Sequence, residues 1–176
     1  MALLLAVAGV AAAHAATLRT GDRAPNFSRP DLSHRQLTLA GYRGRVVLLN
    51  FWASWCEPCM AELPHFRAWQ QQYGARGLQV VGVAMDDHQA PALAAYRKLR
   101  LNFPVVMGGV RLAERYGGIY GVPVTFLLDR QGRIRFIADG AANLPALQRA
   151  IVSLLAAAWS RPAPGPHSPP ASASRP

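Results

Sequence analysis

The strongest constraint on this chain is its pair of cysteines, Cys56 and Cys59, in the run Trp55-Cys56-Glu57-Pro58-Cys59. They are the only two cysteines among 176 residues. Two thiols are too few for a disulfide-stapled framework and cannot complete a structural zinc site by themselves. Covalent haem attachment needs a histidine directly after the second cysteine, and Met60 stands there. The spacing therefore predicts a thiol–disulfide redox pair.

Strands and helices are predicted to alternate around this pair. Residues 45–53 include the continuous apolar run Val46-Val47-Leu48-Leu49, which is typical of a strand buried on both faces. A helix is predicted over residues 58–73, ended by Gly74 and Gly77. The other expected elements are a strand at 78–85, a helix at 90–101, a short strand at 104–107, a short helix at 110–116, strands at 123–128 and 133–138 joined by a hairpin turn, and a helix at 144–159. This order predicts an α/β fold, with a mixed sheet that carries helices on both faces.

The two ends of the chain differ in composition from the middle. Residues 2–13 are an apolar run of signal-peptide length, and Ala13-His14-Ala15 offers small residues at the spacing that signal peptidase needs, although no basic residue precedes the run. We expect residues 1–15 to be a signal peptide, or else an uncleaved anchor, and the protein to be exported. Residues 16–160 are the expected domain, and 161–176 are a Pro/Ser/Ala-rich tail predicted to be disordered.

The two cysteines are expected to have unequal roles. Cys56 falls where the buried strand ends and the helix begins, so free backbone N–H groups and the helix dipole favour a thiolate there. The pKa of Cys56 should then fall below the value of about 8.5 for a free cysteine. Cys56 would attack a substrate disulfide, and Cys59, one turn further on, would resolve the mixed disulfide. Glu57 is either an ordinary acidic residue of a helix first turn or a neighbour that opposes the thiolate by like-charge repulsion.

Two separated motifs resemble the TlpA/ResA-like family of exported thioredoxin-like thiol–disulfide oxidoreductases. The first is Phe51-Trp52-Ala53-Ser54-Trp55-Cys56-Glu57-Pro58-Cys59, and the second is Gly121-Val122-Pro123-Val124-Thr125-Phe126-Leu127-Leu128-Asp129. Residues 24–27 and 37–39 also resemble the N-terminal extension of this family, and the likeness runs from about residue 23 to residue 155. The resemblance implies a thioredoxin-like fold with an N-terminal extension, and an enzyme that needs neither cofactor nor metal.

The resemblance also implies which residues surround the pair. The proline that matches Pro123 is cis in the family and faces the cysteines, and the backbone of the preceding residue, here Val122, pairs with the substrate chain as an added strand. We therefore expect Pro123 beside Cys56 and Cys59 among the catalytic residues. Substrate contacts are expected from the residues next to the thiols and from the loop opposite them, namely Trp55, Glu57, Pro58 and Val122.

A buried acid that moves protons is a further family feature. Common thioredoxins carry it in the strand before the cysteines, at the position of Asn50, which cannot titrate. The ResA-like group instead implies an acid just past the next strand, where Asp86 and Asp87 stand, and Asp87 is the better match. The alternative is that Asp87 is a turn or helix-cap residue before Pro91.

The function predicted from these features is reduction of protein disulfides outside the cytoplasm. Substrates would be proteins with disulfides, including the cysteines of apocytochrome c or of metal sites, and a membrane electron donor would re-reduce the pair. Val124 stands where the cytochrome-specific group often has glutamate, which favours a general TlpA-like activity. An alternative is a copper-binding module, whose relatives space their cysteines by three residues and add a late histidine, whereas His167 here lies in the expected tail. A peroxidase is disfavoured because its cysteine motif is absent.

The chain carries a formal net charge of +10, nearly all of it from arginine, since Lys98 is the only lysine. Such a charge can attract nucleic acid, anionic lipid or an acidic partner. Because no basic cluster is denser than Arg97-Lys98-Leu99-Arg100, we favour a composition bias spread over a solvated surface. A monomer that binds no nucleic acid is expected.

Overall fold

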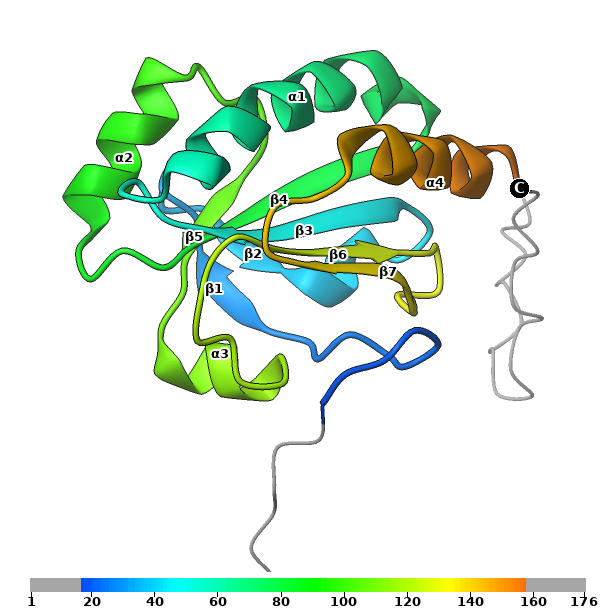
Figure 1. Ribbon diagram of the computed structural model, residues 1–176, viewed down its shortest axis with the longest axis horizontal. Coiled ribbons are helices and arrows are strands. Elements are labelled where there is room, and N and C mark those ends of the chain that lie inside the picture. The colour runs from blue at the N-terminus through cyan, green and yellow to red at the C-terminus, as the bar shows by residue number, and fades with distance from the viewer. Residues whose placement is uncertain (1–16, 158–176) are drawn as a thin grey trace, which may run out of the picture.

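The computed structural model describes residues 17–157, so the expected signal peptide (1–15) and the expected tail (161–176) lie outside the described residues. A five-stranded sheet forms the centre, in the order β5-β4-β3-β6-β7 (Figure 1). Its strands are β3 (Val46–Trp52), β4 (Leu78–Ala84), β5 (Val105–Met107), β6 (Val124–Leu128) and β7 (Ile134–Asp139). The strands β3, β4 and β5 are parallel, while β6 is antiparallel to both β3 and β7. The predicted mixed sheet is confirmed.

Helices cover both faces of this sheet, as the sequence predicted. One face packs against the helices α1 (Glu57–Tyr73), α2 (Gln89–Lys98) and α4 (Leu144–Ala156). The other face packs against α3 (Val110–Arg115) and the N-terminal segment (Figure 1). Within the described part of the chain, no helix is both long and apolar enough to cross a bilayer.

Strand β3 is the centre of the core, because all seven of its residues are buried. Alternate side chains point to opposite faces of a strand. Leu48 and Trp52 therefore join the cluster under α1 and α4, while Leu49 and Phe51 join the cluster under α3. Asn50 has the same parity as Leu48 and Trp52, which places its amide on the α1 side of the sheet.

The N-terminal extension forms a small hairpin of its own. Its strands are β1 (Ser28–Pro30) and β2 (Gln36–Thr38), and a 3₁₀ turn, η1 (Leu39–Tyr42), follows. Asp31 organises the turn between the strands, since one carboxylate oxygen accepts hydrogen bonds from the backbone N–H groups of Ser33 (2.8 Å) and Arg35 (3.0 Å). A backbone bridge from Asp31 to Val106 attaches the hairpin to β5.

The end of α2 differs from the prediction, whereas α1 ends at Tyr73 as predicted. Helix α2 ends at Lys98 and not at residue 101, because Arg100 has a φ of +50°, outside the helical region. At the end of α1, Gly74 keeps a right-handed conformation and starts a 3₁₀ turn, η2 (Gly74–Arg76). Gly77, with a φ of +106°, is the residue that turns the chain into β4.

Candidate functional site

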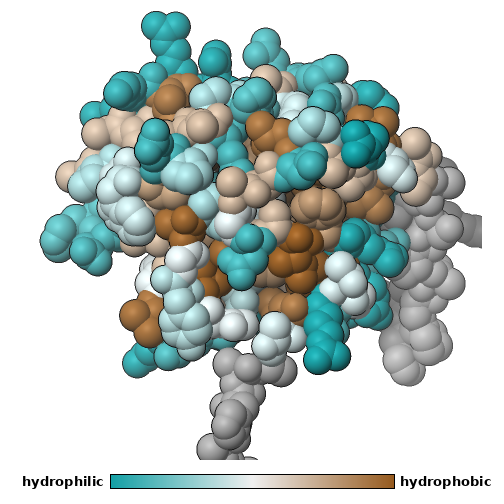
Figure 2. All heavy atoms as spheres, in the orientation of Figure 1, coloured by the Kyte–Doolittle hydropathy of each residue, from teal (hydrophilic) through white to brown (hydrophobic). Residues whose placement is uncertain are grey.

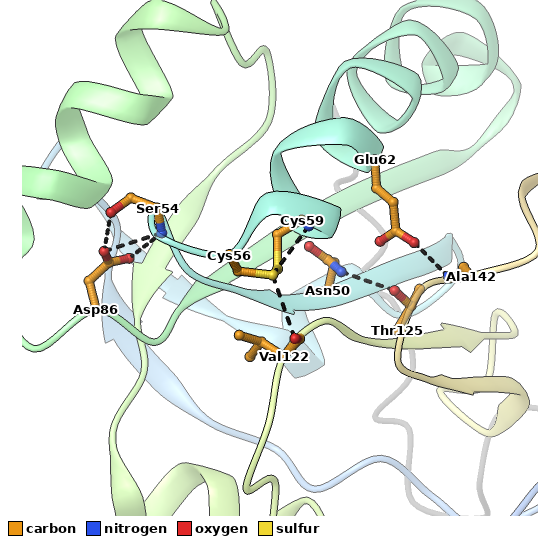
Figure 3. Close-up of a disulfide and its surroundings, with 9 residues drawn as sticks. All are labelled: Asn50, Ser54, Cys56, Cys59, Glu62, Asp86, Val122, Thr125 and Ala142. Carbon is orange, nitrogen blue, oxygen red and sulfur yellow. Dashed lines mark hydrogen bonds between the residues drawn. A yellow bond between two sulfur atoms is a disulfide. The ribbon is translucent and has the colours of Figure 1, made fainter.

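The two cysteines form a disulfide where β3 passes into α1 (Figure 3). The strand ends at Trp52, and Cys56 is the residue immediately before the first helical residue. Its backbone is extended, with φ −89° and ψ 107°, so its side chain lies in the N-cap position of α1. The S–S distance to Cys59 is 2.05 Å and the Cα atoms are 5.3 Å apart.

The helix directs a hydrogen-bond donor at one of these sulfurs. The backbone N–H of Cys59 donates to the Cys56 Sγ across 3.2 Å. Pro58 has no N–H to offer in this first turn. The Cys56 side is also the more open one, since Cys56 is 5% exposed and Cys59 is 1% exposed. A thiolate at Cys56 would thus be both capped by the helix and reachable by substrate.

The loop before β6 lies across from the disulfide. The Val122–Pro123 peptide bond is cis, as the resemblance implied, and Pro123 is buried. The carbonyl oxygen of Val122 is 3.5 Å from the Cys56 Sγ (Figure 3). A disulfide sulfur carries no proton, so this is a van der Waals contact in the oxidised protein. The half-buried Val122 therefore borders the sulfur on the side away from the helix.

Beside this contact is a hollow with a volume of about 150 Å³, rimmed by exposed aromatic side chains. Trp55 is 71% exposed and Tyr120 is 98% exposed. Both line the hollow together with Val122, Met85 and two neighbours on the same loop. Sequence reasoning anticipated Trp55 and missed Tyr120, whose signal is an aromatic residue directly before Gly121, the first residue of the second motif.

The expectation of a buried acid at Asp87 is wrong, because Asp87 is exposed and Asp86 is the buried residue of the two, at 8% exposure. Asp86 accepts hydrogen bonds from the Ser54 hydroxyl (2.5 Å) and from the Ser54 backbone N–H (3.1 and 3.2 Å to its two oxygens). The extended backbone continues past β4, since the Met85 N–H donates to the Trp52 carbonyl. Consecutive side chains therefore point to opposite sides, and only Asp86 turns inward.

Glu62 is the buried carboxylate on the other side of the disulfide, and the sequence reasoning missed it (Figure 3). It lies one helical turn after Cys59, at 5% exposure, and its Oε1 accepts from the Ala142 N–H at 2.5 Å. Its Oε2 has no hydrogen-bond partner within the described residues. Burial raises the pKa of Glu62, and the Ala142 hydrogen bond opposes that rise only in part. The helical spacing of Cys59, Glu62 and Leu63 could have revealed it, because these residues share a face.

Asn50 lies on β3, opposite Thr125 of β6, and on the side of the sheet that packs against α1. Its amide nitrogen donates to the Thr125 hydroxyl at 2.9 Å, and its Oδ1 is buried without a partner among residues 17–157. Asn50 is 1% exposed and has no proton to exchange at ordinary pH. On this side of the disulfide, the titratable group of the described chain is therefore Glu62.

A metal site is not evident around the pair. Over residues 17–157, no three side chains of the metal-ligating types come together in a group that could hold an ion. His167, which the copper-binding alternative would draw on, lies outside the described residues.

A CxxC disulfide at the N-terminus of a helix, on a thioredoxin-like fold, defines a thiol–disulfide oxidoreductase. The chain belongs to the AhpC/TSA family, whose model matches residues 20–137, and within it to the ResA-like group that its motifs resemble. The thiol-disulfide oxidoreductase ResA of Geobacillus thermodenitrificans is 30% identical over 134 residues, which cover 76% of this chain and 77% of that protein. The ResA of Bacillus subtilis is 28% identical over 124 residues, with 70% and 69% covered.

Solved structures agree with this assignment. The crystal structure of a putative thiol:disulfide interchange protein DsbE from Chlorobium tepidum superposes with a TM-score of 0.73 at 33% identity. The match covers 79% of this chain and 99% of that one. The predicted fold, the predicted enzyme class and the predicted family are thereby confirmed.

Proposed function

We propose that this protein reduces disulfides of other proteins outside the cytoplasm, with Cys56 as the attacking residue. The observation that carries the proposal is the geometry at the Cys56 sulfur. One side of this sulfur meets the N-terminal N–H of a helix, and the other meets the Val122 carbonyl at the rim of an open hollow. A substrate chain laid along Val122 as an added strand would bring its own disulfide to Cys56.

The reaction proceeds by two exchanges. The Cys56 thiolate attacks one sulfur of the substrate disulfide, forms a mixed disulfide and expels the other substrate sulfur as a thiolate. Cys59 then attacks the Cys56 sulfur, which closes the bond seen here and releases the first substrate sulfur as a thiol. The substrate gains two electrons and one proton, which the pair gives up, and the expelled substrate thiolate takes its own proton from water. A membrane electron donor that returns two electrons would restart the cycle.

Cys59 must lose its proton before it can resolve the mixed disulfide, and we assign the acceptor as Glu62. Cys59 is almost fully buried, so water reaches it poorly. Glu62 follows it by one turn on the same helix, has a free carboxylate oxygen among the described residues, and has a raised pKa. A carboxyl whose pKa moves towards neutrality is a better match for proton exchange at physiological pH than an ordinary glutamate.

Surrounding charge supports the reducing direction. A strongly stabilised thiolate makes a pair oxidising, whereas weaker stabilisation makes it reducing. Glu57 follows Cys56 directly, and the acids Asp86 and Asp87 lie in the adjacent loop. These negative charges oppose the helix dipole at Cys56 and should keep the thiolate from being over-stabilised. The roles of Trp55, Pro58, Val122 and Pro123 in holding the substrate form part of the same proposal, as does export through residues 1–15.

The reduction potential of the Cys56–Cys59 pair, measured by equilibration with glutathione, tests the direction. We expect a value closer to that of thioredoxin, about −270 mV, than to that of DsbA, about −120 mV. A potential near −120 mV would contradict the reductase assignment. A Cys59→Ser variant expressed in whole cells should hold its substrates as mixed disulfides, and their identity would show whether apocytochromes, metal-site proteins or a broader set is reduced.

A further inference from the structure

The loops at the two ends of the central sheet carry opposite formal charges. The carboxyl ends of β3, β4, β5 and β7 and the loop into β6 meet at the end that carries the disulfide. The segments at this end hold four acidic residues and no lysine or arginine, a formal charge of −4. The segments are 53–57, 85–88, 108–109, 117–123 and 139–143, and the acids are Glu57, Asp86, Asp87 and Asp139.

The opposite end has the reverse composition. Its segments hold eight arginines and two aspartates, a formal charge of +6. The segments are 17–23, 43–45, 74–77, 99–104 and 129–133. A composition bias spread evenly over the surface, the interpretation favoured from the sequence, does not by itself account for this division of the loop charges. The sequence hides the cluster because each segment contributes only one or two arginines.

Backbone contacts bring six of these arginines together around the β6–β7 hairpin, and we call this set the arginine pole. The Gly44 N–H donates to the Arg130 carbonyl at 2.8 Å, which places the 43–45 turn against the hairpin. A side chain at Gly132 would collide with the Arg43 guanidinium. The members of the arginine pole are Arg23, Arg43, Arg45, Arg76, Arg130 and Arg133.

The remaining members reach the same place from other segments. Arg23 pairs with Arg133 in a backbone bridge, and its guanidinium donates to the Gln131 carbonyl at 3.4 Å. Arg45 donates to the carbonyls of Gly74 (2.8 Å) and Leu78 (2.7 Å), on either side of Arg76. Figure 1 shows this hairpin at one end of the sheet and the start of α1 at the other.

The positive charge of the arginine pole is left largely uncompensated. Most of its side-chain hydrogen bonds go to backbone carbonyls, as in Arg130 to Leu154 (2.7 Å) and Arg133 to Gly21 (2.9 Å). Carbonyls accept these bonds without carrying a net charge, apart from about half a unit at the end of a helix such as α4. Asp129, the acid of the hairpin, is paired with Arg135, which is not a member of the pole, at 2.7 Å.

The shape of the pole argues against a small anion as its ligand. The crevice that Arg43 lines has a volume of only about 10 Å³, which is the space of a single water. The charges instead lie on turns at the surface, and Arg23, Arg43, Arg76 and Arg133 are exposed. On the face seen in Figure 2, hydrophilic and hydrophobic side chains lie interspersed.

We propose that the arginine pole docks the protein on an anionic lipid surface and turns the disulfide end away from it. A layer of acidic headgroups attracts the +6 end and repels the −4 end, so the charge division both binds and orients the molecule. Lipid headgroups move to meet charges spread over several turns, and they need no pocket. The disulfide would then face proteins in solution. This docking goes beyond the redox activity and does not depend on its direction.

Vesicle co-sedimentation of the full-length chain tests the docking. The probes are vesicles of phosphatidylcholine alone and of phosphatidylcholine mixed with phosphatidylglycerol, at low and high salt. Each arginine near an anionic surface is worth about fivefold in affinity, so the triple variant Arg23→Gln, Arg43→Gln, Arg76→Gln should bind the mixed vesicles about 100-fold more weakly. High salt should weaken the binding of the wild-type protein to the mixed vesicles, and this measurement needs no variant.

The matched control removes the same charge from outside the pole. Arg29, Arg111 and Arg149 make no side-chain hydrogen bond or ion pair within residues 17–157, and changing all three to Gln should weaken binding less than about fivefold. Equal losses in the two triple variants would overturn the proposal, because net charge alone would then explain binding. The proposal would also be overturned if the pole variant lost affinity for a single-stranded oligonucleotide or for inorganic phosphate while its binding to vesicles stayed unchanged. Disulfide reduction by the pole variant should remain within twofold of wild type, which shows that it is folded.

Discussion

The two ends of the central sheet satisfy their buried polar groups in different ways. At the hairpin end, Arg130 donates to three carbonyls at the end of α4, and Asp129 accepts from the hairpin backbone and from Arg135. At the disulfide end, Glu62 Oε2, Asn50 Oδ1 and Trp52 Nε1 are buried without a partner among the described residues. The division is not absolute, because Arg45 Nε at the hairpin end is also unpaired.

This difference separates stability from reactivity. An unpaired buried polar group costs about 1–3 kcal/mol, and folded proteins tolerate such groups mainly where function needs them. The disulfide end keeps a titratable carboxyl, Glu62, near the redox pair at that cost. The hairpin end, with its bonded arginines, fixes the ends of β6, β7 and α4 to one another. Substitutions at the first end should therefore change chemistry, and substitutions at the second should change stability.

The largest expected effect is loss of activity in Cys56→Ser. A hydroxyl cannot replace the thiolate as nucleophile, so reduction of a protein disulfide should fall by about 10³-fold or more. The rate of thiol release from the substrate measures this loss, and the thermal midpoint of the reduced variant should stay close to that of reduced wild type. Residual activity within tenfold would show that Cys59 attacks unaided.

Arg130→Ala should do the opposite, by lowering stability and leaving the rate unchanged. Its guanidinium donates to Leu154, Leu155 and Ala157, and the loss of these charged hydrogen bonds should cost about 2 kcal/mol in denaturant unfolding. Arg149→Ala is the matched control. Arg149 is exposed on α4, the helix whose C-terminal end Arg130 contacts, and its loss should change stability by less than about 0.5 kcal/mol. Similar losses in both variants would remove the assigned role of Arg130.

Asp86 and Asp87 offer a comparison within the disulfide end. Asp86→Asn weakens the hydrogen bonds to Ser54, two residues before Cys56, and should cost about 1–2 kcal/mol and slow the reaction. Asp87→Asn, at an exposed position, should change stability by less than about 0.5 kcal/mol. Activity and unfolding are measured on both. A loss of activity confined to Asp87→Asn would restore Asp87 as the proton-carrying acid.

Glu62→Gln should reveal the raised pKa through the pH dependence of stability. Since the folded protein holds this proton more tightly than the unfolded chain, wild-type stability falls as pH rises from about the ordinary value of 4.5 through the raised pKa. The glutamine keeps the oxygen that accepts from Ala142 and cannot ionise. The variant should thus match wild type in stability at low pH and become the more stable of the two as pH rises. Thermal midpoints of the two oxidised proteins across this pH range measure the difference. Parallel curves for the two proteins would contradict the raised pKa.

Much of the fold follows from local sequence signals, and the errors have local causes. The apolar run in β3 and the turn before β7 are strong signals, and both were predicted. The strands β1 and β2 were not predicted as strands, because three residues are too few to show a period. The disulfide pair was evident from spacing alone. Asp86 and Asp87 were confused because one step along an extended chain reverses the side on which a residue lies.

The arginine pole and Glu62 show what sequence reasoning misses. The arginines come from four separate segments, so only the fold reveals that they lie together. Glu62 follows the motif closely, but its burial depends on the loop at Ala142, 80 residues further along the chain. Contacts of this kind are set by tertiary packing, which local propensity does not encode.

The central claim is that Cys56 attacks and Cys59 resolves. Cys59→Ser and Cys56→Ser, each reduced and mixed with the same disulfide-containing protein, test it directly when the mixed disulfides are counted by mass spectrometry. The account predicts rapid adduct formation on Cys56 in the Cys59→Ser variant, and adducts at Cys59 in the other variant that form at least about 100-fold more slowly, because Cys59 is 1% exposed and lacks the helix N–H that faces Cys56. Equal rates at the two sulfurs, or faster reaction at Cys59, would contradict it.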